Sequence, residues 1–368
     1  MNGARARRRN NTGRDRRYSL FAMKYDAMRK SRWSARLLLA TTIGTFGCSG
    51  ADTAAPPASI RQPCRLGVAL CASRIEIMPG RFLKSYQSFS LVGGDSLVTQ
   101  AVIVVHGVDR NANDYFSSMN DAAALAGRSL STIVIAPQFQ TSDDTPTADE
   151  PVWTSNGWRA GDLSSSTGPL PRISSYAAID TILARLSNRT KFARLARIVV
   201  VGHSAGGQLV HRYAATSRIA LPLTDIPIRY IAANPSTWLY LGPERGAGNG
   251  FAIPASAADC ADYDDWHYGL QSRNTYANAV TVTLLKQNLV SRDVIVMLGT
   301  ADTLTADLDV SCGADLQGPR RYQRGLTLMN YMNALNPGNG HRLVTVVGVG
   351  HSNSAMFTSV DGRRAIFP

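Results

Sequence analysis

The chain has 368 residues, 44% of them hydrophobic, which suffices for one large hydrophobic core. Its formal net charge is +13, but twelve of the 39 basic residues and only two of the 26 acidic residues precede Cys48, so the rest of the chain carries only +3. That balance excludes the basic surface on which nucleic-acid binding depends, and we expect no nucleic-acid partner.

Residues 1–47 have the composition of a targeting segment. A positively charged stretch at 28–36 precedes an apolar stretch at 37–47, which is too short to hold the chain in a bilayer as a spanning helix. This order predicts export to the periplasm, the cell surface or the medium. The alternative for the first part is that Met28 is the true start and residues 1–27 are a mis-called extension.

Residues 48–62 form a predicted linker that is rich in Ser, Ala, Thr and Pro. Cys48 directly follows the apolar stretch, and this arrangement resembles a bacterial lipoprotein signal. The resemblance implies that Cys48 is lipidated and tethers the protein to a membrane. Thr45 and Phe46 depart from the usual pattern, so ordinary secretion with cleavage nearby is the alternative.

The remaining four cysteines favour two disulfides, because an even number is typical of proteins in an oxidising compartment. Of the three possible pairings we predict Cys64–Cys71, which closes a short loop, and Cys260–Cys312, which ties a long insertion to a later loop. No paired Cys-x-x-Cys spacing occurs, so we expect no metal site.

Strands and helices alternate from residue 73 onward. Weak alternation at 73–77 and 86–91 predicts an antiparallel hairpin with a turn at Gly93-Gly94. Near-continuous apolar runs predict strands at 101–105, 131–136, 197–201, 228–233, 294–298 and 343–347. Helical periodicity predicts helices at 113–129, 176–186, 208–215, 276–289 and 321–335. This order indicates one α/β domain over 63–368, with a mostly parallel sheet covered by helices on both faces.

Two irregular segments interrupt this order. Residues 141–172 form a long polar loop, and an insertion of about 239–290 follows the strand at 228–233. The segment 234–274, which includes much of that insertion, is long enough to form a cap that excludes water from an active site.

Gly202-His203-Ser204-Ala205-Gly206 connects a β-branched run to a helical pattern. Gly-x-Ser-x-Gly in that context places a serine on a sharp strand-to-helix turn with its hydroxyl exposed at the sheet edge. The flanking glycines fit a turn where two backbones approach too closely for a Cβ atom. We therefore predict that Ser204 is a nucleophile.

A serine hydroxyl needs a histidine base and an acid that orients the base. In parallel sheets such groups gather at the carboxyl ends of the strands. His351 follows the last strand in a glycine-flanked loop, whereas His341 precedes that strand, so we predict His351 as the base. Asp302 follows the preceding strand and is the predicted acid, with Asp307 and Asp309 as nearby alternatives.

A tetrahedral intermediate needs hydrogen-bond donors for its oxyanion. The backbone N–H of Ala205, at the start of the helix, is one candidate. The second is the N–H of Val108, in the loop that follows the strand at 101–105. In that loop Gly107 permits close approach of the backbone, and His106 is expected to steady the loop by a side-chain hydrogen bond.

These motifs resemble the α/β-hydrolase family over residues 95–368. His106-Gly107, the elbow at 202–206, the run that ends at Asp302 and Gly350-His351 occur in the order that the family shows. The resemblance implies an α/β-hydrolase fold, a serine triad and acyl chemistry. Because Val108-Asp109-Arg110 follow Gly107, the oxyanion loop departs from the His-Gly-Gly-Gly form of one esterase branch.

The expected function is therefore an exported serine hydrolase that cleaves small or oligomeric carboxylic esters through an acyl-enzyme, without a cofactor. An amidase, peptidase or polyester depolymerase on the same triad is one alternative, and a non-catalytic binding module with this fold is another. Trp153, Trp158 and Trp238 lie in loops at strand ends or in the insertion, where we expect them to line a substrate pocket. Packing in the core is the other interpretation of these tryptophans.

Overall fold

The computed structural model describes residues 61–219 and 225–368. Contacts divide the chain into two units, residues 1–58 and 59–368, and the described residues all belong to the second unit. The predicted targeting segment, Cys48 and nearly all of the predicted linker lie outside the described residues. In the described part, no helix combines the length and the apolar character that a membrane crossing requires.

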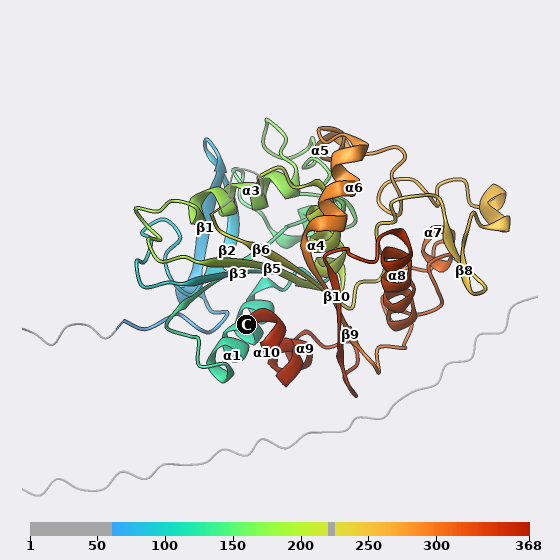
Figure 1. The fold of residues 1–368 in the computed structure, drawn as a ribbon. Coiled ribbons are helices and arrows are strands. Elements are labelled where there is room, and N and C mark those ends of the chain that lie inside the picture. The colour runs from blue at the N-terminus through green and yellow to red at the C-terminus, as the bar shows by residue number, and fades with distance from the viewer. Residues whose placement is uncertain (1–60, 220–224) are drawn as a thin grey trace, which may run out of the picture. The chain divides into compact units, whose positions relative to one another are not determined.

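Eight strands form one sheet in the order β1-β2-β4-β3-β5-β6-β9-β10 (Figure 1). In the order of their numbers they span Ala72–Met78, Arg81–Gln87, Gln100–Val105, Thr132–Pro137, Arg197–His203, Ile228–Ala233, Asp293–Gly299 and His341–Val346. β1 pairs with β2, and β2 with β4, in antiparallel fashion, and all other neighbours are parallel. The mostly parallel sheet that the sequence predicts is confirmed.

The central strands are buried on both faces. Along β5, Ile198 and Val200 pack into the core on one face of the sheet, and Val199 and Val201 into the core on the other. Successive side chains of a strand point to opposite faces, so a run of β-branched residues fills both cores. Each such side chain stabilises the fold by about 1.5–3 kcal/mol.

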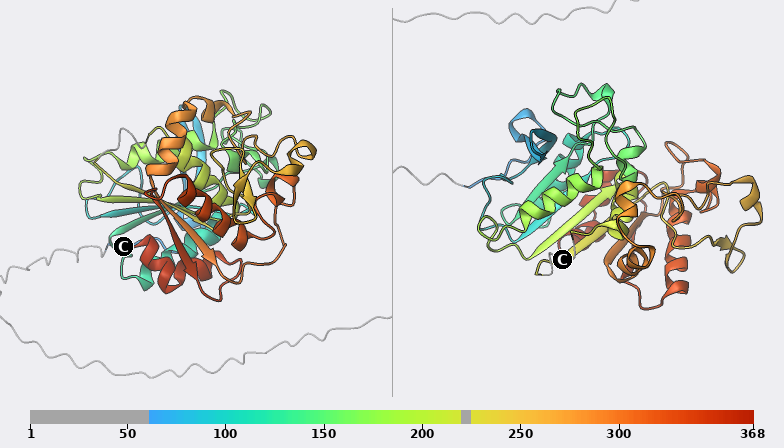
Figure 2. Two further views of the ribbon diagram at one scale, coloured as in Figure 1. Left: turned by 45° about the vertical axis from the view of Figure 1, so that its right-hand side comes forward. Right: turned by 90° about the horizontal axis from the view of Figure 1, so that it is seen from above.

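Helices cover both faces of the sheet, as Figures 1 and 2 show. One core contains side chains from α1 (Ala112–Leu125), α9 (Asn353–Thr358) and α10 (Val360–Ile366). The opposite core contains side chains from α3 (Ser175–Leu186), α4 (Ala205–Thr216), α6 (Val282–Ser291) and α8 (Arg321–Leu335). This two-sided arrangement, with the insertion between β6 and the helices that precede β9, matches the predicted fold class.

The structure corrects the predicted hairpin. β1 and β2 are joined at Pro79-Gly80, and the second strand occupies 81–87 rather than 86–91. Gly80 has a φ of +68°, which a tight turn requires and glycine adopts without strain. The pair Gly93-Gly94, which was predicted as the turn, lies in the loop that follows β2.

The predicted helix at 276–289 is two helices, α5 (Thr275–Asn278) and α6. Thr281 has extended backbone and its side chain accepts a hydrogen bond from the Leu284 N–H, so it caps the start of α6. The sequence analysis also missed α9 and α10. Ser352 and Ser359 cap these two helices in the same way, although neither helix is long enough to show a clear period.

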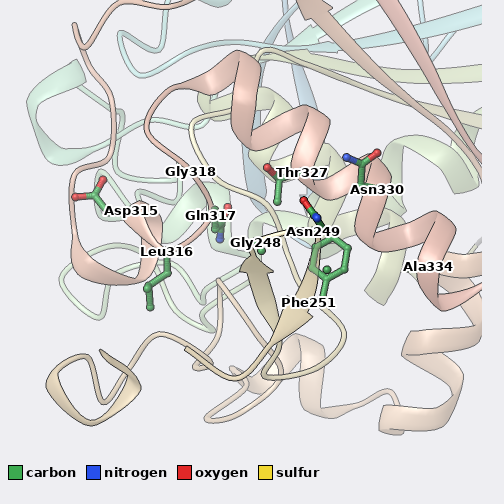
Figure 3. Close-up of a pocket in the computed structure, with 12 residues that line it drawn as sticks. Gly248, Asn249, Phe251, Asp315, Leu316, Gln317, Gly318, Thr327, Asn330 and Ala334 are labelled. Atoms are coloured by element: carbon green, nitrogen blue, oxygen red, sulfur yellow. The ribbon is translucent and has the colours of Figure 1, made fainter. Parts of the chain in front are cut away.

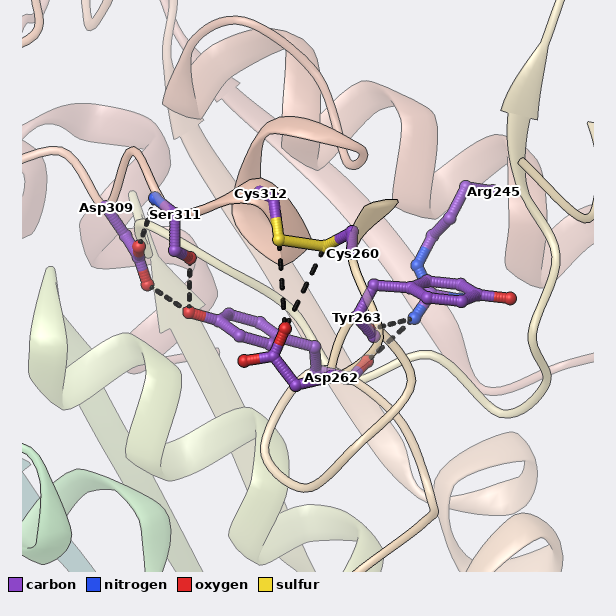
Figure 4. The surroundings of a disulfide bond; sticks show 8 residues. Arg245, Cys260, Asp262, Tyr263, Asp309, Ser311 and Cys312 are labelled. Atoms are coloured by element: carbon purple, nitrogen blue, oxygen red, sulfur yellow. Dashed lines mark hydrogen bonds between the residues drawn. A yellow bond between two sulfur atoms is a disulfide. The ribbon is translucent and has the colours of Figure 1, made fainter. Parts of the chain in front are cut away.

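Both predicted disulfides are confirmed. The Cα atoms of Cys64 and Cys71 are 5.5 Å apart, and those of Cys260 and Cys312 are 5.8 Å apart. The second bond joins the insertion to α7 (Cys312–Asp315), in the connection from β9 to α8 (Figure 4). Next to it, the Tyr268 hydroxyl of the insertion lies 2.7 Å from an Asp309 carboxylate oxygen of the same connection. The insertion is therefore fixed to the segment that follows the predicted acid.

Burial keeps most histidines of this chain uncharged. The pKa lies below the usual 6.5 at five of the six: His106, His203, His211, His267 and His341. At His341 burial lowers the pKa to about 4, and neither ring nitrogen has a hydrogen-bond partner among the described residues. The folded protein must therefore resist protonation at these sites.

This burial predicts a specific pH dependence of stability. His341 binds a proton near pH 6.5 in the unfolded chain and near pH 4 in the folded one, so stability present above pH 6.5 is lost as pH falls through that window. Between pH 6.5 and 4, the free energy of unfolding of the wild type should fall faster than that of His341→Leu, by up to about 1.4 kcal/mol per pH unit. Urea unfolding at several pH values measures the two slopes, and parallel slopes would contradict the neutral state of His341.

Candidate active site

Ser204 stands on a strained turn between β5 and α4. Its backbone has φ 58° and ψ −123°, which non-glycine residues rarely adopt. A Cβ atom on Gly202 would lie 2.3 Å from the Gly206 carbonyl carbon, and one on Gly206 would lie 2.3 Å from the Val105 carbonyl oxygen. Only glycine fits at either position, so the Gly-x-Ser-x-Gly spacing is a packing requirement of this turn.

His351 and Asp302 meet at the same edge of the sheet. His351 follows β10, Asp302 follows β9, and these two strands are parallel neighbours. His351 Nδ1 lies 2.6 Å from Asp302 Oδ2, and Asp302 is almost fully buried. With Nδ1 directed to the carboxylate, Nε2 is the nitrogen left to accept a proton from a serine hydroxyl.

Ser204 and His351 line one cavity of about 310 Å³. Among the described residues, no hydrogen bond joins the Ser204 hydroxyl to the His351 ring. Such bonds are often long when no substrate is bound and shorten in the reactive complex. The structure thus brings the predicted nucleophile and base together at one cavity, and the predicted acid to the base.

The second oxygen of Asp302 faces a buried cation. Asp302 Oδ1 lies 3.5 Å from a guanidinium nitrogen of Arg321, and both side chains are fully buried. Arg321 also donates hydrogen bonds to the Ala306 and Leu304 carbonyl oxygens, at 2.6 and 3.4 Å. Burial lowers the pKa of Arg321, and the charge of Asp302 opposes that effect. The carboxylate is held between the imidazole and the guanidinium.

The alternative acids have other positions. Asp309 accepts hydrogen bonds from the Tyr268 hydroxyl and the Ser311 N–H, so it binds the insertion rather than His351. Burial would raise the pKa of Asp309, but these hydrogen bonds outweigh burial and lower it. Asp307 lines the cavity of Ser204, where its own backbone has a φ of +51°. Of the three, only Asp302 forms a hydrogen bond with His351 in the described structure.

His106 steadies the predicted oxyanion loop. Its Nδ1 lies 2.9 Å from the Gly107 carbonyl oxygen, and its Nε2 lies 3.0 Å from the Phe139 N–H nitrogen. These partners assign the proton to Nδ1, which then donates to Gly107. Burial lowers the pKa of His106 to about 4, so the ring stays neutral and can accept from Phe139.

The two predicted oxyanion donors flank Ser204. Val108 lines the cavity, and a Cβ on the preceding Gly107 would lie 3.8 Å from the Ser204 Cβ atom. Ala205 is the first residue of α4, where backbone N–H groups lack helical partners, and it is almost fully buried. Their position is compatible with the predicted role, which stays a prediction.

The predicted tryptophan lining does not match the structure. Trp153, Trp158 and Trp238 are all buried, and none of them lines the cavity beside Ser204. Trp158 packs against His106, with ring centroids 4.6 Å apart, and Trp238 packs against His211 at 4.9 Å. The loops that carry these rings fold inward, so the rings contribute their apolar area to the core. Trp158 is connected to the site through its packing against His106.

Sequence reasoning missed most of the cavity lining. The additional residues are Asp109, Asn111, Tyr115, His203, Ser352 and Asn353. Asp109 and Asn111 follow β3, and Ser352 and Asn353 follow His351, so a search for every polar residue after a strand would have found these four. Tyr115 lies in the first turns of α1, and no local pattern indicates that its hydroxyl reaches His203 Nδ1, 3.2 Å away.

A larger cavity lies elsewhere. It measures about 820 Å³ between the hairpin of β7 (Arg245–Ala247) and β8 (Gly250–Ala252) and helix α8, and contains neither Ser204 nor His351 (Figure 3). No described residue of the insertion lines the cavity beside Ser204, so the described insertion does not form the expected cap over Ser204.

One group of potential metal ligands occurs in the described part of the chain: Cys260, Asp262 and Cys312. The two sulfur atoms form a disulfide and have no thiolate to offer, so this group is not a metal site.

No protein-family model matches the sequence, and no curated protein matches it. Among solved structures, the LpqC poly(3-hydroxybutyrate) depolymerase from Bordetella parapertussis is similar, with a TM-score of 0.54, 23% identity and coverage of 77% of this chain and 86% of that chain. Poly(aspartic acid) hydrolase-1 from Sphingomonas sp. KT-1 has a TM-score of 0.57 and 21% identity, and the match covers 83% of this chain and 100% of that chain. At these identities the likeness establishes the fold, and chemistry must be argued from the site.

Proposed function

We propose that this chain, which has the α/β-hydrolase fold, is an exported serine hydrolase that cleaves carboxylic esters. The main observation in support is that Ser204, on its strained elbow, shares a cavity with His351. His351 Nδ1 in turn lies 2.6 Å from Oδ2 of the buried Asp302. A surface serine does not need a strained backbone, and a solvated histidine does not need a buried carboxylate. A non-catalytic binding module does not require a strained serine beside a histidine that is bonded to a buried carboxylate.

In the proposed mechanism the Ser204 hydroxyl attacks the ester carbonyl and His351 Nε2 takes its proton. Asp302 keeps the imidazole in the required tautomer and stabilises the imidazolium, while Arg321 stabilises the carboxylate from the other side. The N–H groups of Ala205 and Val108 receive the oxyanion. His351 then protonates the leaving alcohol, and water, activated by the same ring, releases the acid from the acyl-enzyme.

The cavity favours small esters that are neutral or cationic. Asp109 and Asp307 contribute two carboxylates to its lining, and no Lys or Arg is among the described lining residues. A volume of about 310 Å³ with Val108 as its main aliphatic side chain leaves little room for a long acyl chain. This charge opposes a polyanion such as poly(aspartic acid), whereas a neutral polyester remains the second candidate substrate.

Export and lipidation are part of the proposal. The two disulfides support an oxidising compartment. We propose that residues 1–47 direct export and that Cys48 carries the lipid, with ordinary secretion as the alternative. Mass spectrometry of the mature N-terminal peptide distinguishes them: an acylated Cys48 supports the tether, and a free terminus elsewhere in the linker contradicts it.

Ester turnover should depend on the triad. With p-nitrophenyl acetate and butyrate, Ser204→Ala should reduce kcat to background, and Asp302→Asn should reduce it by about 10³–10⁴-fold because the imidazole loses its orienting carboxylate. Asp309→Asn is the matched control and should retain kcat within about threefold. Equal turnover by Ser204→Ala and the wild type would remove the mechanism, and faster cleavage of matched anilides than of esters would favour the amidase alternative.

Substrate charge should affect kcat/KM. Acetylcholine should be hydrolysed about tenfold better than an anionic acetate ester of similar size at low salt, because the carboxylates attract the cation and screening weakens this effect. The uncharged 3,3-dimethylbutyl acetate should fall between them. The double substitution Asp109→Asn and Asp307→Asn should remove most of this preference, whereas Asp121→Asn, on the exposed side of α1, should not. A preference that survives the double substitution contradicts the charge argument.

A further inference from the structure

Asn234 contacts the three loops that carry the proposed triad. It directly follows β6, and its Oδ1 accepts a hydrogen bond of 2.8 Å from the Gly299 N–H, at the end of β9. Its Nδ2 donates to the Gly350 carbonyl oxygen at 3.3 Å and lies 3.5 Å from His203 Nε2. Gly350 precedes His351, His203 precedes Ser204, and Gly299 lies three residues before Asp302. One amide therefore joins the acid loop, the base loop and the elbow.

The position of this amide is fixed. Asn234 is 1% exposed, and its backbone N–H donates to the Met297 carbonyl oxygen at 3.0 Å. Its φ of +46° is left-handed, a region that asparagine tolerates better than most residues. The Gly299 N–H requires an acceptor. The Gly350 carbonyl oxygen, which also accepts from the Ser352 N–H at 3.0 Å, can only accept, so these two partners assign the orientation of the amide.

His203 links Asn234 to His351, the proposed base. Its ring packs against the His351 ring with centroids 4.5 Å apart, and Tyr115 lies at its other nitrogen. Burial, followed by the proximity of His351, keeps the pKa of His203 well below its usual value. A neutral His203 that accepts from Asn234 at Nε2 carries its proton at Nδ1, facing the Tyr115 hydroxyl. The base thus packs against an uncharged ring whose orientation two hydrogen bonds determine.

We propose that Asn234 is a positioning residue of the triad, whose amide sets the spacing of the three loops so that His351 can meet Ser204. The inference rests on the proposed function, because it assigns Asn234 a role in that reaction. Asn234 does not line the catalytic cavity, so it acts through its partners and not on the substrate. A displacement of about 1 Å between reacting groups is enough to reduce a rate about 100-fold, which is why a remote amide matters.

Several ionisable groups already surround His351, and each of them affects how the ring responds to a new charge nearby. Asp302 bonds to the ring, His203 packs on it, and Arg321 faces the second oxygen of Asp302. The other ionisable groups at the cavity are Asp109, Asp307 and Tyr115. A carboxylate at position 234 would add a negative charge beside His203 and the His351 loop, on a side where the described residues place no acidic group in contact.

The experiment compares Asn234→Gly, Asn234→Asp and Asn288→Ala in ester hydrolysis. Asn234→Gly keeps the left-handed backbone and removes only the amide, and we expect kcat to fall about 10–100-fold with KM changed by less than about threefold. Asn288→Ala is the matched control: Asn288 is also buried, and its amide donates to the Ala215 carbonyl oxygen, away from the cavity. It should lower the melting temperature and leave kcat and the pH profile unchanged.

Asn234→Asp adds a second measurement, the pH dependence of kcat/KM, which a loss of fold stability alone would not change. The carboxylate still accepts from Gly299 but repels the Gly350 carbonyl oxygen, and its charge stabilises imidazolium at the active site. We expect the acid limb of the kcat/KM profile to move to higher pH by about half a unit to one unit. Because aspartate matches asparagine in size, this variant carries the test even if Asn234→Gly does not fold.

The outcomes separate the inference from the proposed function. If Ser204→Ala abolishes turnover while Asn234→Gly keeps kcat within about threefold and the acid limb of Asn234→Asp does not move, the positioning role is wrong and the triad stands. A fall in kcat with a shifted acid limb supports the role. If Ser204→Ala turns over as fast as the wild type, the proposed function itself fails and the inference fails with it.

Discussion

The close approach of three backbone segments at the Ser204 turn is the constraint on which the proposed site depends. Gly206 lies so near the Val105 carbonyl that a methyl group at that position would overlap it, and Gly202 is as close to Gly206. This contact allows β5 to continue directly into α4, so that Ser204 is the one residue that must leave regular geometry. The buried sheet and the helices on both of its faces hold the turn in place, and their packing compensates the cost of the strained residue.

Burial also fixes the charge states around that turn. Desolvation lowers the pKa of His106 and His203, so each ring accepts one hydrogen bond and donates another without carrying a charge. Asp302 is buried too, but the His351 imidazole donates a hydrogen bond to it and the Arg321 guanidinium compensates its charge. The polar groups next to Ser204 therefore have fixed charge states and hydrogen-bond partners before any substrate binds, which is the preorganisation that the proposed reaction needs.

The sequence predicted the parts of this site that local patterns specify. Ser204, His351 and Asp302 each follow a run that is recognisable as a strand, and parallel strands bring their carboxyl ends to one edge, although the strand before His351 is a partly exposed edge strand. It could not predict long-range contacts such as that of Tyr115 with His203, or the three-way contact of Asn234, because they depend on how distant segments pack. The tryptophans were wrongly predicted for a similar reason. An aromatic residue in a loop is as typical of a buried core position as of a binding pocket, and here the loops fold inward. Short capped helices such as α9 and α10 were missed because fewer than two turns give no measurable period.

The proposed triad would make Ser204 the one reactive serine among many. The most direct test of this claim is to react the folded mature protein with a fluorophosphonate probe and to locate the adduct by peptide mass spectrometry. We expect a single adduct on Ser204, which forms in the folded protein and is abolished by prior unfolding. A folded protein that resists the probe, or an adduct on a different serine, would contradict it.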